Sequence, residues 1–143
     1  MEPEIIKALY RASQAGVQID LIVRGPCSLK PGVTGISDNI RVRSIIGRFL
    51  EHPRVVYFGN GGEPEVWLSS ADWMERNFFR RVEVAFPVLD KKHKERVIAD
   101  LNGYLEDKAQ TWLLQADGTY QRPDKIPAGA QGIQQKLLEE ALS

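Results

Sequence analysis

The stretch VQIDLIVRG, Val17 to Gly25, decides the fold class. It is short, rich in β-branched residues and apolar on both faces, which is typical of a strand covered on both sides. Such a strand favours a parallel or mixed sheet that lies under helices. Because helical patterns alternate with further strand patterns along the chain, the sequence predicts an α/β sandwich with a central mixed sheet flanked by helices.

The strands of this central sheet are predicted from short apolar or alternating runs bounded by turn residues. They are Val17–Arg24, Arg54–Phe58, Glu65–Ser69 and Arg81–Phe86. The second and third flank the loop GNGGEP and read as a hairpin, which explains the glycines better than a phosphate-binding loop does. A second hairpin is predicted to turn at Asp117-Gly118.

Helices are predicted around these strands. One opens the chain and ends at Ala15-Gly16, one is capped by Asp90, and an amphipathic one covers Gln131 to Leu142. SSADWMERNFFR is expected to hold only a short helical turn within a loop.

A further helix is predicted to lead to His52. Its cap would be Ser37 or Asp38, and its apolar residues follow the spacing i, i+3, i+4, i+7 through Phe49. His52 would continue that stripe at the helix C-terminus, where a cation is favoured. Two interpretations stay open: an imidazole used for proton transfer or contact with a phosphoryl oxygen, and a surface histidine that caps carbonyl groups.

Two arginines are the other candidates for a phosphate site. Arg24 ends a predicted strand and precedes Gly-Pro, at the edge where α/β sheets bind ligands, and a guanidinium there suits a bidentate grip on phosphate. Pairing with a nearby carboxylate is the alternative. Arg81 opens another predicted strand and shares a face with Glu83, so a solvated strand face is equally consistent with it.

Composition narrows the classes of function. The 143 residues fit one domain, and 19 Lys plus Arg balance 19 Asp plus Glu, so net charge does not indicate a polyanion partner. The single cysteine, Cys27, excludes an internal disulfide and is a poor candidate nucleophile. Two histidines and one cysteine do not make a zinc site, and His93 lies among lysines in solvent. No export or membrane-spanning segment is visible, which suits the cytoplasm.

Five segments in order carry a family resemblance: IVRGPCSL, GISDNIRVRSI, FLEHPRV, LSSADWM and RRVEVAFPVLD. Together they resemble the C-terminal segment of polyphosphate kinase, the long-chain family that works through a phosphohistidine. The resemblance is dense from Ala12 to Gly103. It implies a phospholipase D-like core of two similar α/β halves that face each other across an active site. Residues 1–143 would be a single domain forming the C-terminal half.

The resemblance implies roles for three residues already singled out. Arg24, His52 and Arg81 would line the phosphate tunnel, contact the nucleotide's phosphates and converge on one electropositive site. His52 would assist catalysis without being the covalent carrier. The phosphorylated histidine, the metal-associated arginines and the adenine-contacting region lie outside this chain. ATP is thus implied as substrate and Mg as a metal with no ligand here, so the isolated chain is expected to be inactive.

The implied partners are inorganic polyphosphate, ATP or ADP, and the remaining domains of the parent enzyme. The full-length enzyme is expected to form a homo-oligomer and to bind no nucleic acid. It is expected to have no membrane span, although it could associate with the surface of a membrane. Two alternatives remain: half of a phospholipase D-like phosphodiesterase, and a non-catalytic module that binds polyanions or a partner protein. The first alternative needs a histidine and a lysine two residues apart, whereas Pro53 and Arg54 follow His52.

Overall fold

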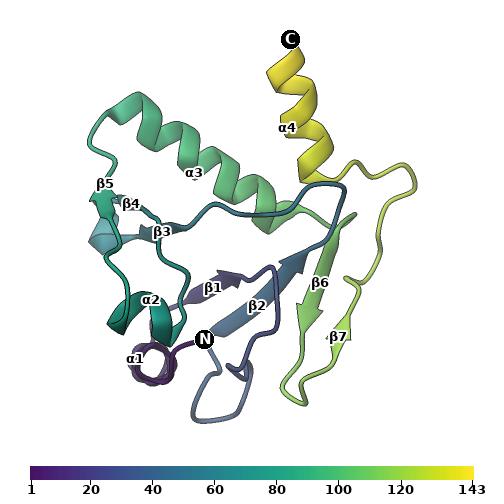
Figure 1. The fold of residues 1–143 in the computed structure, drawn as a ribbon. Helices are drawn as coiled ribbons and strands as arrows, with labels where there is room; N and C mark the ends of the chain where they lie inside the picture. The colour runs from purple at the N-terminus through teal and green to yellow at the C-terminus, as the bar shows by residue number, and fades with distance from the viewer. The chain divides into compact units, whose positions relative to one another are not determined.

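The computed structural model describes residues 1–143 and divides them into two compact units. The first unit comprises Met1, Pro3–Glu51 and Glu106–Ser143, and the second comprises Glu2 and His52–Leu105. The elements in chain order (Figure 1) are α1 (Pro3–Gln14), β1 (Ile19–Ile22), β2 (Ile40–Ile45), β3 (Val55–Phe58), the 3-10 turn η1 (Asn60–Gly62), β4 (Glu65–Ser69), α2 (Glu75–Phe79), β5 (Ala85–Pro87), α3 (Lys91–Glu106), β6 (Thr111–Leu114), β7 (Tyr120–Gln121) and α4 (Ile133–Leu142).

The first unit contains a four-stranded mixed sheet in the order β1-β2-β6-β7. β1 is parallel to β2, with Ile19 opposite Ile40, whereas β6 is antiparallel to both β2 and β7. The α/β class and the mixed sheet predicted from Val17–Gly25 are therefore confirmed. The hairpin at Asp117-Gly118 is also confirmed, and Gly118 has a φ of 89°, a left-handed conformation that glycine adopts without strain.

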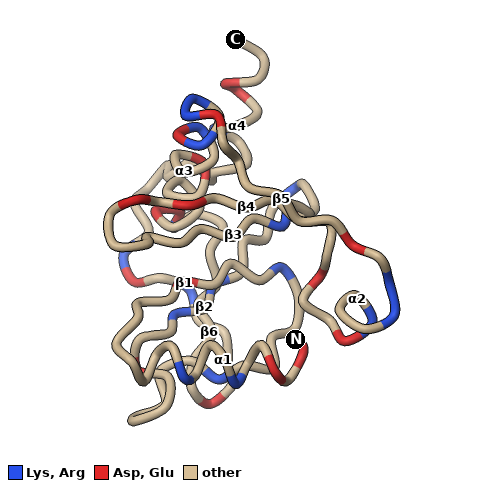
Figure 2. The backbone as a smooth tube through the Cα atoms, turned by 90° about the vertical axis from the view of Figure 1, so that its left-hand side faces the viewer, with Lys and Arg blue, Asp and Glu red and all other residues tan.

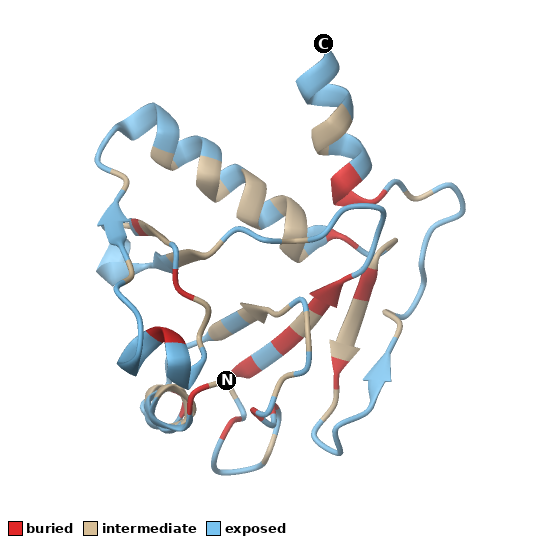
Figure 3. Ribbon diagram, viewed as in Figure 1, coloured by how far each residue is buried: buried red, intermediate tan, exposed pale blue.

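The core of the first unit lies between α1 and this sheet. Leu29, Ile40, Val42 and Leu114 are buried at its centre. The apolar face of α1 packs against them, and Figure 3 shows buried residues of β2 alternating with exposed and intermediate ones. Cys27 is half-buried beside the same cluster, where a thiol behaves as a small apolar side chain.

The helix predicted before His52 is wrong, because residues 40–45 form strand β2. In IRVRSI the apolar or small residues Ile40, Val42 and Ser44 alternate with Arg41 and Arg43, and all three are buried. This period of two places one face on the core and the arginines on the other face. β-branched residues and a parallel partner strand favour that arrangement over a helix.

The two arginines of β2 meet Asp20, which stands opposite Arg41 in the ladder between β1 and β2. Arg41 donates to both carboxylate oxygens of Asp20, at 3.0 and 2.9 Å, and this raises the pKa of Arg41 above its ordinary value. Arg43 lies 3.7 Å from Asp20, and burial lowers the pKa of the Arg43 guanidinium. Cross-strand pairing thus neutralises the polar face of both strands.

Ser37 and Asp38 were expected to cap the absent helix, and they stabilise the loop before β2 instead. Ser37 is completely buried; its hydroxyl donates to the carbonyl of Lys30 at 2.7 Å and accepts from the amide of Val33 at 3.0 Å. Asp38 accepts from the amide of Gly35 at 2.7 Å. Such local side-chain bonds compete with helix initiation and favour turns.

The second unit contains an antiparallel sheet in the order β3-β4-β5. The predicted hairpin of Arg54–Phe58 and Glu65–Ser69 is confirmed, and its loop includes Gly61 and Gly62 with φ of 64° and 102°. The prediction of one sheet for all four ranges is wrong, since Val17–Arg24 contributes β1 to the other sheet. The alternation that identified these strands carries no information about which strands pair.

The strand predicted at Arg81–Phe86 is shorter than expected. β5 covers only Ala85–Pro87, and Val82 before it is 99% exposed. Pro87 has no amide hydrogen, which restricts β5 to the edge of the sheet. α3, by contrast, begins where Asp90 predicts, because the Asp90 carboxylate accepts from the amide of His93 at 2.9 Å. The short helix α2 and the tail helix α4 are likewise confirmed.

Candidate functional site

His52 lies in an irregular segment between β2 and β3, and its side chain is exposed. The structure has no helix that ends there, so the expected support from a helix C-terminus is wrong. Pro53 follows directly and limits the local backbone to extended conformations. The imidazole is therefore carried by an extended connection, at the point where the chain passes from the first unit to the second.

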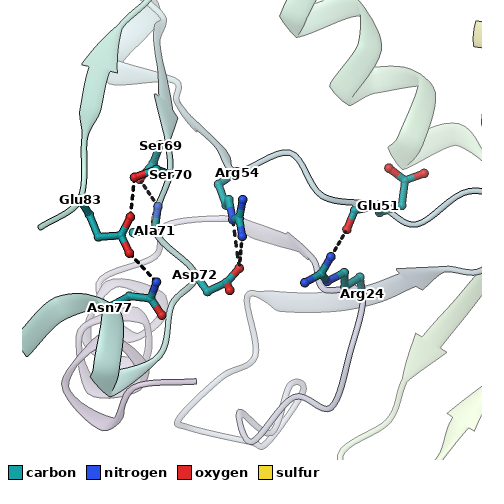
Figure 4. Close-up of polar contacts among 9 residues, drawn as sticks. All are labelled: Arg24, Glu51, Arg54, Ser69, Ser70, Ala71, Asp72, Asn77 and Glu83. Carbon is teal, nitrogen blue, oxygen red and sulfur yellow. Dashed lines mark hydrogen bonds and ion pairs between the residues drawn. The ribbon is translucent and has the colours of Figure 1, made fainter. Parts of the chain in front are cut away.

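The chain after His52 is fixed by Arg54. Its guanidinium donates twice to Asp72 Oδ1, from Nε at 3.0 Å and from Nη2 at 2.8 Å, and its carbonyl accepts from the amide of Ser69 at 2.9 Å. Figure 4 shows Arg54 and Asp72 facing each other. Both side chains are largely buried, which strengthens the ion pair relative to one on the surface. The residue two places after His52 is thus held by side chain and main chain.

Arg24 stands two residues beyond β1, in the first unit, with its side chain mostly exposed. The amide of Val23 donates to the carbonyl of Arg43 at 2.8 Å, so ladder bonding continues up to the residue before Arg24. Arg24 Nη1 donates to the carbonyl of Glu51 at 3.1 Å (Figure 4). That bond orients the guanidinium toward the segment that precedes His52 in the chain.

Arg81 lies in the second unit, in the irregular stretch before β5, and is exposed. Two residues later Glu83 accepts a short hydrogen bond from Ser70 Oγ and another from Asn77 Nδ2 at 2.6 Å (Figure 4). Ser70 Oγ also accepts from the amide of Val84 at 3.0 Å. These side-chain bonds replace the ladder that a longer β5 would make, and they determine the course of the chain that carries Arg81.

Glu83→Gln is expected to reduce the loss of unfolding free energy that occurs as pH falls below about 4.5. Hydrogen bonds from Ser70 and then Asn77, with weaker attraction from Arg81 and Arg54, lower the pKa of Glu83 below its ordinary 4.5. The stabilisation is therefore complete above pH 4.5 and is lost as pH falls through the lowered folded value. Urea unfolding from pH 7 downward measures this, and Ser70→Ala should reduce the loss as well. An unchanged loss in Glu83→Gln would contradict the assignment.

The residues that hold these candidates were missed by the sequence reasoning. In the second unit, an ion pair and side-chain hydrogen bonds hold the chain near His52 and Arg81; they involve Arg54, Asp72, Ser70, Asn77 and Glu83. Part of the signal was present, since LSSADWM is a polar run directly after a strand, a place where side chains bond to neighbouring main chain. The pairing of Arg54 with Asp72 across 18 residues has no counterpart in local spacing.

Positive and negative side chains both occur along the whole chain, and their totals balance (Figure 2). No group of three or more His, Cys, Asp or Glu side chains gathers where it could hold a metal ion. None of the helices is long and apolar enough to cross a membrane. Any anion site must therefore depend on a few individually positioned cations.

The three predicted site residues differ in their surroundings. Arg24 belongs to the first unit, and His52 and Arg81 belong to the second. All three are exposed, and each adjoins chain that is fixed by hydrogen bonds or an ion pair. Their convergence on a single electropositive site stays a prediction.

Known proteins give an independent comparison. The family described as "Polyphosphate kinase C-terminal domain 2" matches residues 1–134. The polyphosphate kinase of Paraburkholderia phytofirmans is 60% identical over 134 residues, which covers 92% of this chain and 20% of that protein. The polyphosphate kinase of Pseudomonas aeruginosa is 58% identical over 142 residues, covering 97% of this chain and 20% of that protein.

A solved structure agrees with the sequence matches. The crystal structure of polyphosphate kinase from Porphyromonas gingivalis matches with a TM-score of 0.90 at 39% identity, over 99% of this chain and 22% of that chain. This likeness confirms the fold expected from the resemblance. The chain spans about a fifth of the length of the curated relatives it matches. On sequence and fold together, this chain belongs to the family of polyphosphate kinase C-terminal domains.

Proposed function

We propose that this chain forms the C-terminal half of a two-half, phospholipase D-like catalytic core. The full enzyme would transfer the terminal phosphate of ATP reversibly to inorganic polyphosphate. Family membership over residues 1–134 supports this function. Because the chain spans about a fifth of its relatives, its part is to supply phosphate-contacting residues to a site that other domains complete.

Arg24, His52 and Arg81 are the residues that we assign to this role. The transferred phosphoryl group carries charge on its equatorial oxygens, so its transition state is stabilised mainly by fixed cations and donors. Arg24 and Arg81 would bind phosphate oxygens with their guanidinium groups. His52 would either move a proton or hold a phosphoryl oxygen, and the covalent phosphohistidine would be supplied by the other half of the core.

The observation that carries the assignment is the way in which the chain is held on both sides of His52. The carbonyl of Glu51, immediately before it, accepts from Arg24, and Arg54, two residues after it, is paired with Asp72. Each of these bonds lies within one unit, and an imidazole next to a hydrogen-bonded residue loses less entropy when it meets a ligand than one on an unbonded loop does. Stability alone gives no reason to place an exposed histidine between two such bonded residues.

Magnesium is implied by the family, but the residues present do not fit a magnesium site. Oxygen ligands such as carboxylates are required. Asp72 is committed to Arg54, Glu83 to Ser70 and Asn77, and no acidic cluster exists elsewhere. Any metal would therefore have its ligands outside this chain, and no step here depends on one.

The proposed full-length enzyme is a cytoplasmic homo-oligomer, with or without peripheral membrane association. Its remaining domains supply the other part of the active site.

Labelling with ATP that is radioactive in its terminal phosphate tests the proposal. The full-length enzyme containing this chain should form acid-insoluble polyphosphate, whereas the 143-residue chain alone should form neither polyphosphate nor an acid-labile phosphohistidine. The reason is that the covalent step needs a histidine of the other half. A full-length enzyme that makes no polyphosphate would contradict the function. Stoichiometric labelling of His52 in the isolated chain would contradict the role assigned to that residue.

A further inference from the structure

Gln134, the second residue of α4, binds the segment before His52 with its whole side-chain amide. Its Nε2 donates to the carbonyl of Phe49 at 2.8 Å, and its Oε1 accepts from the amide of Phe49 at 3.0 Å. Nε2 also donates to Glu51 Oε1 at 2.7 Å. The amide therefore satisfies both main-chain groups of Phe49, as a neighbouring strand would, although the two residues are 85 positions apart.

Gln134 is itself buried, and its main chain is hydrogen-bonded to Gln110. The residue is only 6% exposed, and its main-chain amide donates to Gln110 Oε1 at 3.4 Å. The carbonyl of Gln110 in turn accepts from the amide of Ile46 at 3.0 Å. A Cβ at Gly47 would overlap the side-chain ends of both glutamines, so the loop approaches them as closely as a glycine allows. A buried, fully bonded amide of this kind specifies one conformation of the segment that it contacts.

The same segment is where Arg24 bonds. Glu51 is bound at two points: Gln134 bonds to its carboxylate, and Arg24 donates to its carbonyl at 3.1 Å. A long arginine side chain has about 2 kcal/mol of rotamer entropy, so a fixed acceptor is needed to keep its guanidinium in one place. If Glu51 moved, the acceptor of Arg24 would move with it. The position of Arg24 therefore depends on Gln134 through Glu51.

We infer that Gln134 is a positioning residue of the phosphate site. It does not touch substrate; it fixes residues 49–51, and through the carbonyl of Glu51 it presents the guanidinium of Arg24 to phosphate. This inference rests on the proposed function, because it assumes that Arg24 contacts phosphate there. A displacement of about 1 Å in a positioned group can lower a rate by up to about 100-fold, so the effect of releasing the loop is measurable.

A double-mutant cycle in the full-length enzyme tests the inference. Gln134→Ala should lower kcat/KM for polyphosphate synthesis about 10-fold when Arg24 is present, and less than about twofold in the Arg24→Ala background, because coupled residues are not additive. Gln135→Ala is the matched control. Gln135 is exposed on the same helix, its amide donates to Glu139 at 2.7 Å, and its loss should change neither value. Independent, multiplying losses, or equal losses in the control, would overturn the inference.

A second variant covers the case in which Gln134→Ala does not fold. Gln134→Glu keeps the length and the acceptor for Phe49, but it loses the donor and places a carboxylate against Glu51. Its activity should be low at neutral pH and should recover in part toward acidic pH, where a proton shared by the two carboxylates restores the bond to Glu51 but not the one to the carbonyl of Phe49. A pH profile parallel to that of the unmodified enzyme would overturn the inference. An unmodified enzyme without synthesis would instead refute the proposed function, and this inference with it.

Discussion

Replacing Arg24 by alanine is expected to weaken phosphate binding by the full-length enzyme by about 1.5–3 kcal/mol, the usual range for a charge-assisted hydrogen bond. That range corresponds to a loss of roughly 10- to 150-fold. The guanidinium is exposed beyond β1 and held by the carbonyl of Glu51, so little reorganisation precedes contact with an anion. Calorimetric titration with inorganic polyphosphate measures the loss. Arg11→Ala, an exposed arginine of α1, removes the same charge and should bind normally.

Two further measurements identify the cause of that loss. Arg24→Lys keeps the charge but not the planar fork, so its affinity should lie between those of the unmodified enzyme and the alanine variant. Binding should weaken as salt is raised, and the slope should be smaller in Arg24→Ala because one ionic contact is missing. Unchanged polyphosphate affinity in Arg24→Ala would mean that Arg24 only anchors Glu51, and the phosphate assignment would fail.

The sequence predicted Arg24 as a candidate because of its place, beyond the carboxyl end of a buried strand. The predicted strand is longer and more buried than the observed one, since β1 covers only Ile19–Ile22, contains no buried residue and leaves Arg24 two residues beyond its end. The sequence could not predict its hydrogen bond to the carbonyl of Glu51, 27 residues later. Every residue has a carbonyl, so side-chain chemistry gives no signal for such a contact. Only the route of the loop determines which carbonyl is within reach.

The main error of the sequence interpretation concerns β2, and its cause is an ambiguous pattern. Val42, Ile45 and Ile46 satisfy helical spacing, while Ile40, Val42 and Ser44 alternate with two arginines at a period of two. Both periods share Val42, so spacing alone does not decide between them. The deciding interactions are tertiary: β2 pairs with β1 on one side and β6 on the other, and its apolar face is buried in the core, which overrides local propensity.

The helix error also affected the interpretation of His52. A helix C-terminus would have supplied a local electrostatic reason for the histidine, whereas the structure has an extended segment there. The residues that fix this segment, Gln134 and Arg54, were not recognised. Gln134 looks like one more polar residue of an amphipathic tail helix, and only its 6% exposure reveals that it is a core contact. The sequence thus contains no signal for the residues that support this segment.

Asp107→Ala is expected to give the largest loss of stability among these variants, about 2–4 kcal/mol in the free energy of unfolding. Asp107 is 7% exposed and accepts from two main-chain amides, Ile133 at 2.5 Å and Gln110 at 2.7 Å. The first of these bonds replaces the missing cap of α4, whose N-cap residue, Gly132, has no side chain. Alanine would leave the buried amide of Ile133 and the partly buried amide of Gln110 without this acceptor; an unsatisfied buried donor costs about 1–3 kcal/mol, and a partly buried one costs less.

Urea unfolding at neutral pH measures the loss, and two further variants define its cause. Asp107→Asn keeps one acceptor but turns a donor toward the second amide, so its loss should approach that of alanine, even though the size of the side chain is preserved. Glu106→Ala changes the exposed neighbouring residue and should stay within about 0.5 kcal/mol of the unmodified chain.

Since Asp107 fixes the start of α4, and Gln134 follows Ile133 there, Asp107→Ala should also release residues 49–51. Faster amide hydrogen exchange at Phe49 would report that release. Unchanged exchange at Phe49 in a destabilised Asp107→Ala variant would show that α4 holds the loop without this cap.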